Sequence, residues 1–280
     1  MASAHRGYLT LAARDPRYLE MAVDMALSLR AHTDLPVALA ADDALAEVAR
    51  TRYAAAFDTV RILPERFRRG RALKYGTAEA SPFEETMFVD ADCIVLGSLD
   101  DLFAVLATAD MAMVGQHLTA DDDVEHHGFS TASLMRRFGL SSYLKTNSGL
   151  FGFRRQPALA IMEECLACYT DEVLRRLRWK ALFGGWLGDE LAFGIVGGRR
   201  SFGVLPEPRT MYWPEEFASL DLSRPTKPLL HMLWPLRPEQ LDQLVEGTTS
   251  RRRAAGLPGD AAAHWREETR RLKRLERQRR

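Results

Sequence analysis

The chain has 280 residues, of which 46% are hydrophobic and 27% charged, and its 38 basic side chains equal its 38 acidic ones in number. This is the composition of a folded protein, and it excludes a disordered chain or a low-complexity fibre. The zero net charge conceals an asymmetry. Residues 250–280 carry 11 basic and 4 acidic side chains, a net charge of +7, against −7 for residues 1–249.

The charge distribution bears on partners. An acidic body lacks the basic stripe that neutralises phosphates, so specific nucleic-acid binding is not expected. Residues 1–249 are predicted to be the folded domain, and 250–280 a basic helical or partly disordered tail. The simplest interpretation is that the tail is exposed to solvent. The alternative is that it binds an acidic partner or an anionic surface.

The cellular location is predicted from what the sequence lacks. No apolar run approaches the roughly 18 residues of a transmembrane segment, and the stretch 7–13 is too short for a signal peptide. The three cysteines give no disulfide framework, and Cys165 and Cys168 form a CxxC that we expect to pack inside a helix rather than bind metal. A cytoplasmic protein is expected, with attachment to the inner face of a membrane left open.

Strand-like and helix-like segments alternate along the first part of the chain. Apolar runs at 8–13, 36–41 and 59–63 are separated by periodic helical patterns that begin after Asp15 and Asp42. This alternation predicts a mainly parallel sheet with helices on both faces. Further strands are expected at 86–89, 93–97, 111–116, 147–153 and 229–233, helices at 99–108 and 157–177, and a long polar connection at 117–146.

Two carboxylates follow the strand predicted at 86–89. Asp90 and Asp92 lie at the end of that strand, where open α/β sheets bind ligands. Side chains two apart in an extended segment project to the same side, so both can face one cation. Hard oxygen ligands suit Mg²⁺ or Mn²⁺, which would bridge the oxygens of a diphosphate.

The words around this pair resemble a known family. The segment MFVDADCIVLGSLDDLF at 87–103 closely resembles the metal-binding signature of GT-A glycosyltransferases, and especially of family 8, which includes glycogenin and bacterial lipopolysaccharide galactosyltransferases. TNSGLFGF at 146–153, GGWLGDELAF at 184–193 and YLTLAARD at 8–15 are similar to other segments of that family. The resemblance covers about residues 7–235. It implies a GT-A, Rossmann-like α/β fold with a mixed, mainly parallel sheet flanked by helices.

The resemblance also implies site residues. The metal ligands would be Asp90, Asp92 and His231, and the catalytic residues would be Asp189, Lys74 and Asn147. The nucleotide sugar would contact Leu11, Ala12, Lys74, Asp90, Ala91, Asp92 and Ser148. The family follows its histidine with a Gly and a Lys-Pro-Trp, whereas MLWPLRPEQ follows His231, so Arg237 becomes a candidate replacement for the missing cation.

The function implied is transfer of a sugar from a nucleotide-diphosphate donor, UDP-linked, to an acceptor hydroxyl, with Mn²⁺ or Mg²⁺ as cofactor and retention of configuration. The acceptor would be a saccharide, a lipid-linked molecule or another hydroxyl compound. Two alternatives stay open. One is a haloacid-dehalogenase-type phosphohydrolase that uses Asp90 and Asp92, and the other is a non-catalytic binding protein with a glycosyltransferase fold.

One polar cluster lies outside the segments that resemble the family. DDDVEHH at 121–127 has no ligand spacing fixed by predicted secondary structure, so a solvated loop is favoured over a second metal site. We interpret it as an acceptor-side lid that excludes water from a bound donor.

Overall fold

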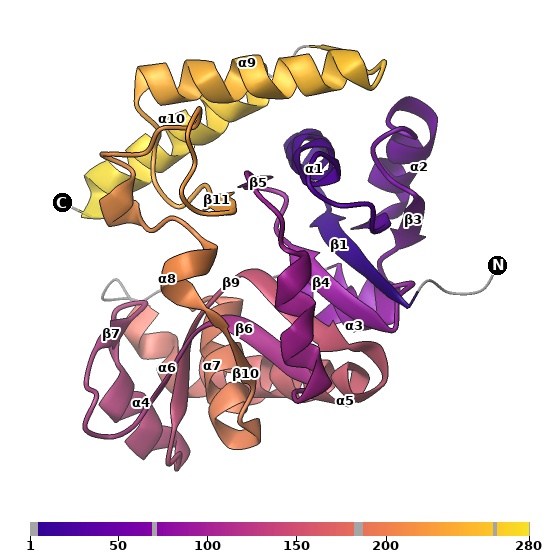
Figure 1. Ribbon diagram of the computed structural model, residues 1–280. Helices are drawn as coiled ribbons and strands as arrows, with labels where there is room; N and C mark the ends of the chain where they lie inside the picture. Colours follow the sequence, from indigo (N-terminus) through magenta and orange to yellow (C-terminus); the bar gives the residue numbers. More distant parts are fainter. Residues whose placement is uncertain (1–4, 69–71, 182–186, 260–261, 280) are drawn as a thin grey trace. The chain divides into compact units, whose positions relative to one another are not determined.

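The computed structural model describes residues 5–68, 72–181, 187–259 and 262–279 (Figure 1). The chain forms two compact units. The DxD unit, named after the motif Asp90-Ala91-Asp92, comprises Arg6–Ile62, Val89–Asp101 and Pro208–Arg280. The NSG unit, named after Asn147-Ser148-Gly149, comprises Met1–His5, Leu63–Phe88 and Leu102–Glu207. Each unit therefore combines segments that are far apart in the sequence.

The DxD unit is built on three parallel strands in the order β1 (Arg6–Ala12), β2 (Val37–Ala41) and β3 (Thr59–Ile62). Helix α1 (Pro16–Arg30) follows β1, and α2 (Asp43–Arg52) follows β2. The side chains of Asp15 and Asp42 cap the two helices by accepting a first-turn backbone N–H. The strand–helix alternation predicted for this part of the chain is confirmed.

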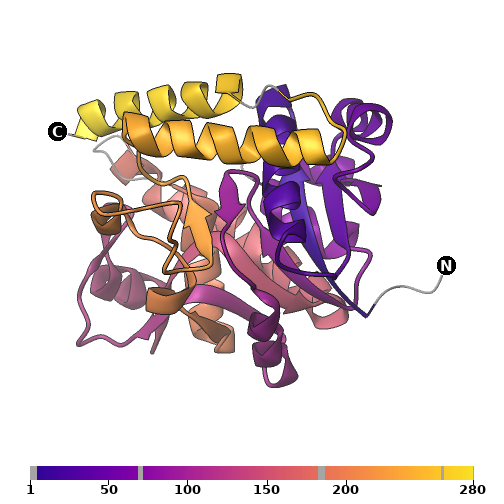
Figure 2. The same cartoon turned by 45° about the horizontal axis from the view of Figure 1, so that its top comes forward.

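The remainder of the DxD unit comes from late in the chain. Strand β5 (Cys93–Val95) pairs antiparallel with β11 (Leu229–His231), and η5 (Pro214–Glu216) precedes β11. Helices α9 (Pro238–Ala254) and α10 (Ala262–Arg279) run side by side and pack on α1 (Figures 1 and 2). None of the described helices carries an apolar stretch sufficient to cross a bilayer.

The basic tail is part of this unit. The boundary expected between residues 249 and 250 falls inside α9, and the tail includes the end of α9 and all of α10. Arg252 is 1% exposed and Trp265 is fully buried. The exposed side chains of α10 are mainly basic, so this helix has one face in the core of the unit and one cationic face in solvent.

The NSG unit holds four strands in the order β10 (Gly203–Pro206), β6 (Met111–Leu118), β9 (Tyr143–Arg154) and β4 (Glu85–Val89). Strand β10 is parallel to β6, and β6 is antiparallel to β9 with an irregularity between Met113 and Val114. Its helices and short elements are η1 (Glu65–Phe67), η2 (Leu73–Gly76), α3 (Thr77–Ala80), β7 (Glu125–His126), β8 (Phe129–Ser130), α4 (Thr131–Phe138), α5 (Arg155–Ala167), the π-helical η4 (Cys168–Val173), α6 (Leu174–Ala181) and α7 (Asp189–Arg200). Two further elements, η3 (Asp100–Ala107) and α8 (Glu207–Thr210), each contain residues of both units.

Glycines let α7 approach β9 closely. A Cβ at Gly194 would lie 2.6 Å from the Tyr143 ring, and one at Gly198 would lie 2.1 Å from the carbonyl oxygen of Ser142. Side chains at these positions would push the helix off the strand. The sheet below is packed by aromatic side chains, with the rings of Phe88 and Phe151 stacked at 4.6 Å. The middle and the last part of α7 are thereby held against the start of β9.

The mixed, mainly parallel α/β class predicted from the sequence is confirmed. The prediction of one long polar connection at 117–146 is wrong, because these residues contain α4, β7, β8 and the first part of β9. The helix expected at 157–177 is present as α5, η4 and the start of α6. Residues 184–186 of the Gly-rich segment lie outside the described residues.

Candidate functional site

The DxD motif forms a turn. The backbone N–H of Cys93 donates to the carbonyl oxygen of Asp90 at 3.1 Å, so residues 90–93 close a tight turn between β4 and β5. The expected extended conformation of this segment is wrong, because this hydrogen bond bends the chain. Both carboxylates are about one-fifth exposed, and Ala91 between them is 4% exposed.

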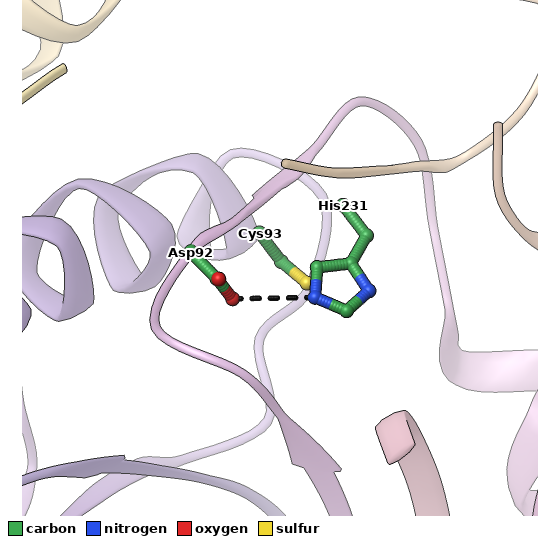
Figure 3. A group of neighbouring side chains, drawn as sticks. All are labelled: Asp92, Cys93 and His231. Carbon is green, nitrogen blue, oxygen red and sulfur yellow. Dashed lines mark ion pairs between the residues drawn. The ribbon is translucent and has the colours of Figure 1, made fainter. Parts of the chain in front are cut away.

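His231 lies beside both aspartates. Its Nε2 is 3.3 Å from Oδ1 of Asp92 and 3.9 Å from Oδ2 of Asp90, and its side chain is 7% exposed (Figure 3). The antiparallel pairing of β5 with β11 sets this position, because His231 is the direct partner of Cys93. The structure thus brings together the three residues that the family resemblance implies as metal ligands.

This donor set fits a divalent cation. Two carboxylates and an imidazole within this separation suit Mn²⁺ or Mg²⁺, with water or ligand oxygens in the remaining positions. The neighbouring thiol adds a third donor type, since ligand atoms of Asp92, Cys93 and His231 all lie within 4.8 Å of one another. Among the described residues one other group has comparable spacing, formed by His126, His127 and Glu190 of the NSG unit.

The negative charge of Asp92 reaches two other elements of the DxD unit. Burial raises the pKa of Tyr18 at the start of α1, and the charge of Asp92 adds to that shift. The hydrogen bond to Glu268 raises the pKa of Arg271 on α10, with a further contribution from Asp92. A cation of the basic tail therefore lies within electrostatic reach of the DxD motif, whereas Arg237 is exposed at the start of α9.

The turn after β1 belongs to the same unit. Leu11 is half-buried and Ala12 is fully buried in the strand. Arg14 has a φ of 72°, and its backbone N–H donates to Oδ2 of Asp42 at 2.6 Å. This hydrogen bond ties the turn after β1 to the start of α2.

The other predicted residues meet in the NSG unit. Lys74, from η2, donates from Nζ to Oγ of Ser148 at 2.8 Å and to its carbonyl oxygen at 3.1 Å, and Nζ lies 3.6 Å from Oδ2 of Asp189. Oγ of Ser148 is 3.3 Å from the same Asp189 oxygen. Asn147 is 7% exposed, and its Oδ1 accepts the backbone N–H of Gly149 at 2.8 Å. Gly188 is the N-cap of α7, so Asp189 is its first helical residue and not its cap.

Glu190 joins this cluster, which the sequence did not indicate. Its Oε1 accepts the backbone N–H of Ser148 at 2.8 Å, and its Oε2 is hydrogen-bonded to Nε2 of His127. Burial would raise the pKa of Glu190, but the hydrogen bond and charge of His127 outweigh burial and lower the pKa to about 2. The one sequence signal for Glu190 was its place in an Asp-Glu pair at a predicted helix start. Acidic side chains are common at such positions because they interact favourably with the helix dipole, so the pair alone does not indicate a site.

His126 is also part of the core and not of a solvated loop. Its Nε2 donates to the carbonyl oxygen of Thr146 at 3.1 Å, which leaves Nδ1 to accept from the Tyr143 hydroxyl at 2.7 Å. Burial, with the charge of His127, lowers the pKa of His126 to about 4. The acidic residues 121–125 are exposed, and Asp122 and Asp123 bond locally to Thr119 and Ser130.

The CxxC pair is buried in α5 and η4 of the NSG unit. Burial is the main cause that raises the pKa of both thiols, well above its usual range for Cys165 and to about 12 for Cys168. A thiol with a raised pKa is a poor nucleophile. Neither cysteine belongs to a group of described residues with the spacing of metal ligands. The expectation that this pair packs in a helix is confirmed.

The fold is that of the GT-A glycosyltransferases, as the sequence predicted. Three solved structures show the likeness. The bifunctional glycosyltransferase WbbM matches 89% of this chain and 50% of its own at 13% identity and a TM-score of 0.58. The galactosyltransferase LgtC, in complex with donor and acceptor sugar analogs, matches 93% and 99% at 13% identity and a TM-score of 0.56. The glycosyltransferase GlyE of Streptococcus pneumoniae TIGR4 matches 81% and 54% at 14% identity and a TM-score of 0.51.

The likeness is one of fold. No known protein-family profile and no curated protein matches the sequence. The chain spans about half the length of WbbM and GlyE but nearly all of LgtC.

Proposed function

We propose that this protein is a metal-dependent glycosyltransferase that transfers a sugar from a nucleotide-diphosphate donor, UDP-linked, to an acceptor hydroxyl with retention of configuration. The observation that carries the proposal is the convergence of Asp90, Asp92 and His231 in a GT-A fold. A pair of carboxylates and a lone buried histidine are each common in proteins that bind no metal there. Together they form a typical set of ligands for Mn²⁺ or Mg²⁺.

The metal would be held by Asp90, Asp92 and His231, and when bound it would neutralise charge on the leaving diphosphate. The chain's own residues prepare that centre. The turn at residues 90–93 fixes the direction of both carboxylates, and the β5–β11 pairing fixes His231. Leu11, Ala12 and Ala91 are proposed to contact the nucleotide, as the family resemblance implies.

The cluster in the NSG unit is proposed to bind the sugar. The Lys74 ammonium and the Ser148 hydroxyl offer donors, and the Asp189 carboxylate offers an acceptor, within 3.6 Å of one another. A carboxylate so placed can accept sugar hydroxyls or stabilise positive charge that develops at the anomeric carbon. Asn147 is proposed to face the sugar or acceptor, with its Oδ1 held by Gly149.

The test is hydrolysis and transfer with a panel of nucleotide sugars, with and without Mn²⁺. We expect Mn²⁺-dependent release of UDP, loss of most turnover in Asp92→Asn, and no change in Asp101→Asn, an exposed aspartate of the same unit. The anomeric configuration of the product, read by NMR, tests retention. Absence of nucleotide-sugar binding together with an inert Asp92→Asn substitution would rule the proposal out. Phosphatase activity that is lost in Asp90→Asn would favour the phosphohydrolase alternative.

The exposed face of α10 supports a further part of this proposal, a contact with an anionic surface. Arg266, Arg270, Lys273, Arg274 and Arg277 are exposed, with Glu267 as the acidic neighbour. Clustered cations attract anionic lipid head groups in a salt-dependent manner. Co-sedimentation with phosphatidylserine vesicles at low and high salt tests this, with the five positions changed to Gln as the comparison. Equal sedimentation of both proteins would contradict it.

A further inference from the structure

We infer that Cys93 makes the DxD centre a site for a thiophilic divalent cation of the Zn²⁺ class, held by Asp92, Cys93 and His231. The inference deepens the proposed function, because it concerns the same centre and names an ion that would exclude Mn²⁺ from it. It rests on a thiol that the tight turn and the strand pairing place beside the two other ligands.

The β-ladder sets the position of the thiol. Cys93 and His231 are direct partners in the antiparallel pair β5–β11. The side chains of direct partners lie on the same face of the ladder, with Cβ atoms about 4.5–5.5 Å apart. Figure 3 shows the sulfur of Cys93 beside the imidazole, with the carboxylate of Asp92 facing the same ring nitrogen. Ligand atoms of all three residues lie within 4.8 Å of one another.

The chemistry of the three donors favours a soft ion. Zn²⁺ takes sulfur, nitrogen and oxygen ligands at about 2.0–2.3 Å in a tetrahedral arrangement, so these residues supply three ligands and leave one position for water. A thiolate selects Zn²⁺ or Cd²⁺ over Mn²⁺ and Mg²⁺, which prefer oxygen donors. On binding, the thiol proton passes to the buffer and the sulfur takes its place as a ligand. Full burial of Cys93 keeps the sulfur away from bulk solvent and oxidants.

The two donor sets overlap. Asp92 and His231 belong to both, while Asp90 completes the hard set and Cys93 the soft set. One ion therefore excludes the other, and a thiophilic cation would displace Mn²⁺. The structure thus assigns to this centre an inhibition by Zn²⁺-class ions that is competitive with Mn²⁺.

The experiment is a titration of the full chain with Cd²⁺ in the absence of any nucleotide, read by the ultraviolet charge-transfer band of a Cd²⁺–thiolate bond. The matched control is Cys165→Ser, which removes a buried thiol of the NSG unit. We expect a band that saturates at one equivalent in the wild type and in Cys165→Ser, that is absent in Cys93→Ser, and that excess Mn²⁺ removes. Calorimetry should show Cd²⁺ affinity at least about tenfold lower in Cys93→Ser, with Mn²⁺ affinity unchanged.

Each other outcome overturns the inference. A wild-type protein with no band, or a band that persists in Cys93→Ser, excludes Cys93 as a ligand. Equal losses of Mn²⁺ and Cd²⁺ affinity in Cys93→Ser would make the thiol a packing group only. If Cys93→Ser does not fold, Asp92→Asn is the second variant, and a full-strength band in that variant also overturns the inference. The Cd²⁺ titration contains no sugar nucleotide, so its result is independent of the turnover assay. Turnover with Mn²⁺ but no Cd²⁺ band would overturn this inference alone, and a band without turnover would leave this inference intact.

Discussion

The guanidinium of Arg252 is ion-paired with the carboxylate of Asp24 although 228 positions separate them, and both side chains are buried. The other Asp24 oxygen accepts from Nε2 of His264 and Nε1 of Trp265, each at 2.7 Å. Arg252 also reaches Glu20 at 2.7 Å. One buried carboxylate on α1 thus joins both C-terminal helices to the body of the DxD unit.

We expect Arg252→Ala to lower the free energy of unfolding of the DxD unit by about 3–5 kcal/mol, because it leaves a buried carboxylate without its cation. The adjacent Arg253 is exposed, and Arg253→Ala should change the same quantity by less than about 0.5 kcal/mol. Hydrogen exchange of α1, α9 and α10 in increasing denaturant measures both. Equal effects of the two substitutions would contradict the prediction.

The same contacts predict the effect of truncation. Removal of residues 250–280 takes away Arg252, His264 and Trp265, the three tail donors to Asp24, together with the part of α9 and the whole of α10 that pack on α1. We expect the truncated chain to lose the protected amides of α1. A truncated chain with native exchange and intact metal-dependent turnover would show that the tail is a separable appendage, as the domain division expected from the sequence implies.

Lys74→Met should lower kcat/KM for nucleotide-sugar turnover by about 10²- to 10³-fold, because it removes the one ammonium that contacts both Ser148 and Asp189 in this cluster. Binding of Mn²⁺ alone should not change, since the metal ligands are other residues. Lys273→Met, an exposed lysine of α10, is the matched control. Steady-state kinetics and Mn²⁺ titration check both parts. A loss of Mn²⁺ affinity in Lys74→Met would mean that the substitution acts through folding.

Glu190→Gln should lower turnover by loosening Ser148, which Glu190 holds through a backbone hydrogen bond of 2.8 Å. The folded-state pKa of about 2 lies below the ordinary value of 4.5, so this carboxylate stabilises the fold fully above pH 4.5 and loses that contribution as the pH falls towards 2. The melting temperature should therefore depend less on pH between pH 2 and 5 in Glu190→Gln than in the wild type. Glu163→Gln, an exposed pair partner of Arg66, is the control. An equal pH dependence of the melting temperature in Glu190→Gln and in the wild type would contradict this role.

The sequence predicted the strands well because their signals are local. Apolar runs before Asp15, Asp42 and Asp90 end where the chain turns, and each became a strand of the structure. The DxD–His centre could be proposed only through resemblance, because Asp92 and His231 are 139 positions apart and only the β5–β11 register joins them.

The contacts of the NSG cluster were out of reach of local patterns. Glu190 and His127 are 63 positions apart, and both belong to segments that read as a helix start and a polar loop. Whether a histidine is solvated or buried depends on partners such as Tyr143, which only the tertiary fold provides. The same holds for Asp24, whose place among the apolar residues of α1 gives no sign of the three donors that come from the tail.

His126 gives the NSG unit a stability that depends on pH. Its pKa is lowered from 6.5 to about 4, so between pH 4 and 6.5 this histidine binds a proton in the unfolded chain but not in the folded one. Stability should therefore be complete above pH 6.5 and fall as the pH drops towards 4, by up to about 3 kcal/mol. We expect His126→Gln, which keeps polar atoms but cannot titrate, to be less stable at pH 7 yet nearly independent of pH over this window. Hydrogen exchange of β9 across the window measures the slope. A slope that is equal in His126→Gln and in the wild type would assign it to another group, and the exposed His5 of the same unit, as His5→Gln, is the control that should leave it unchanged.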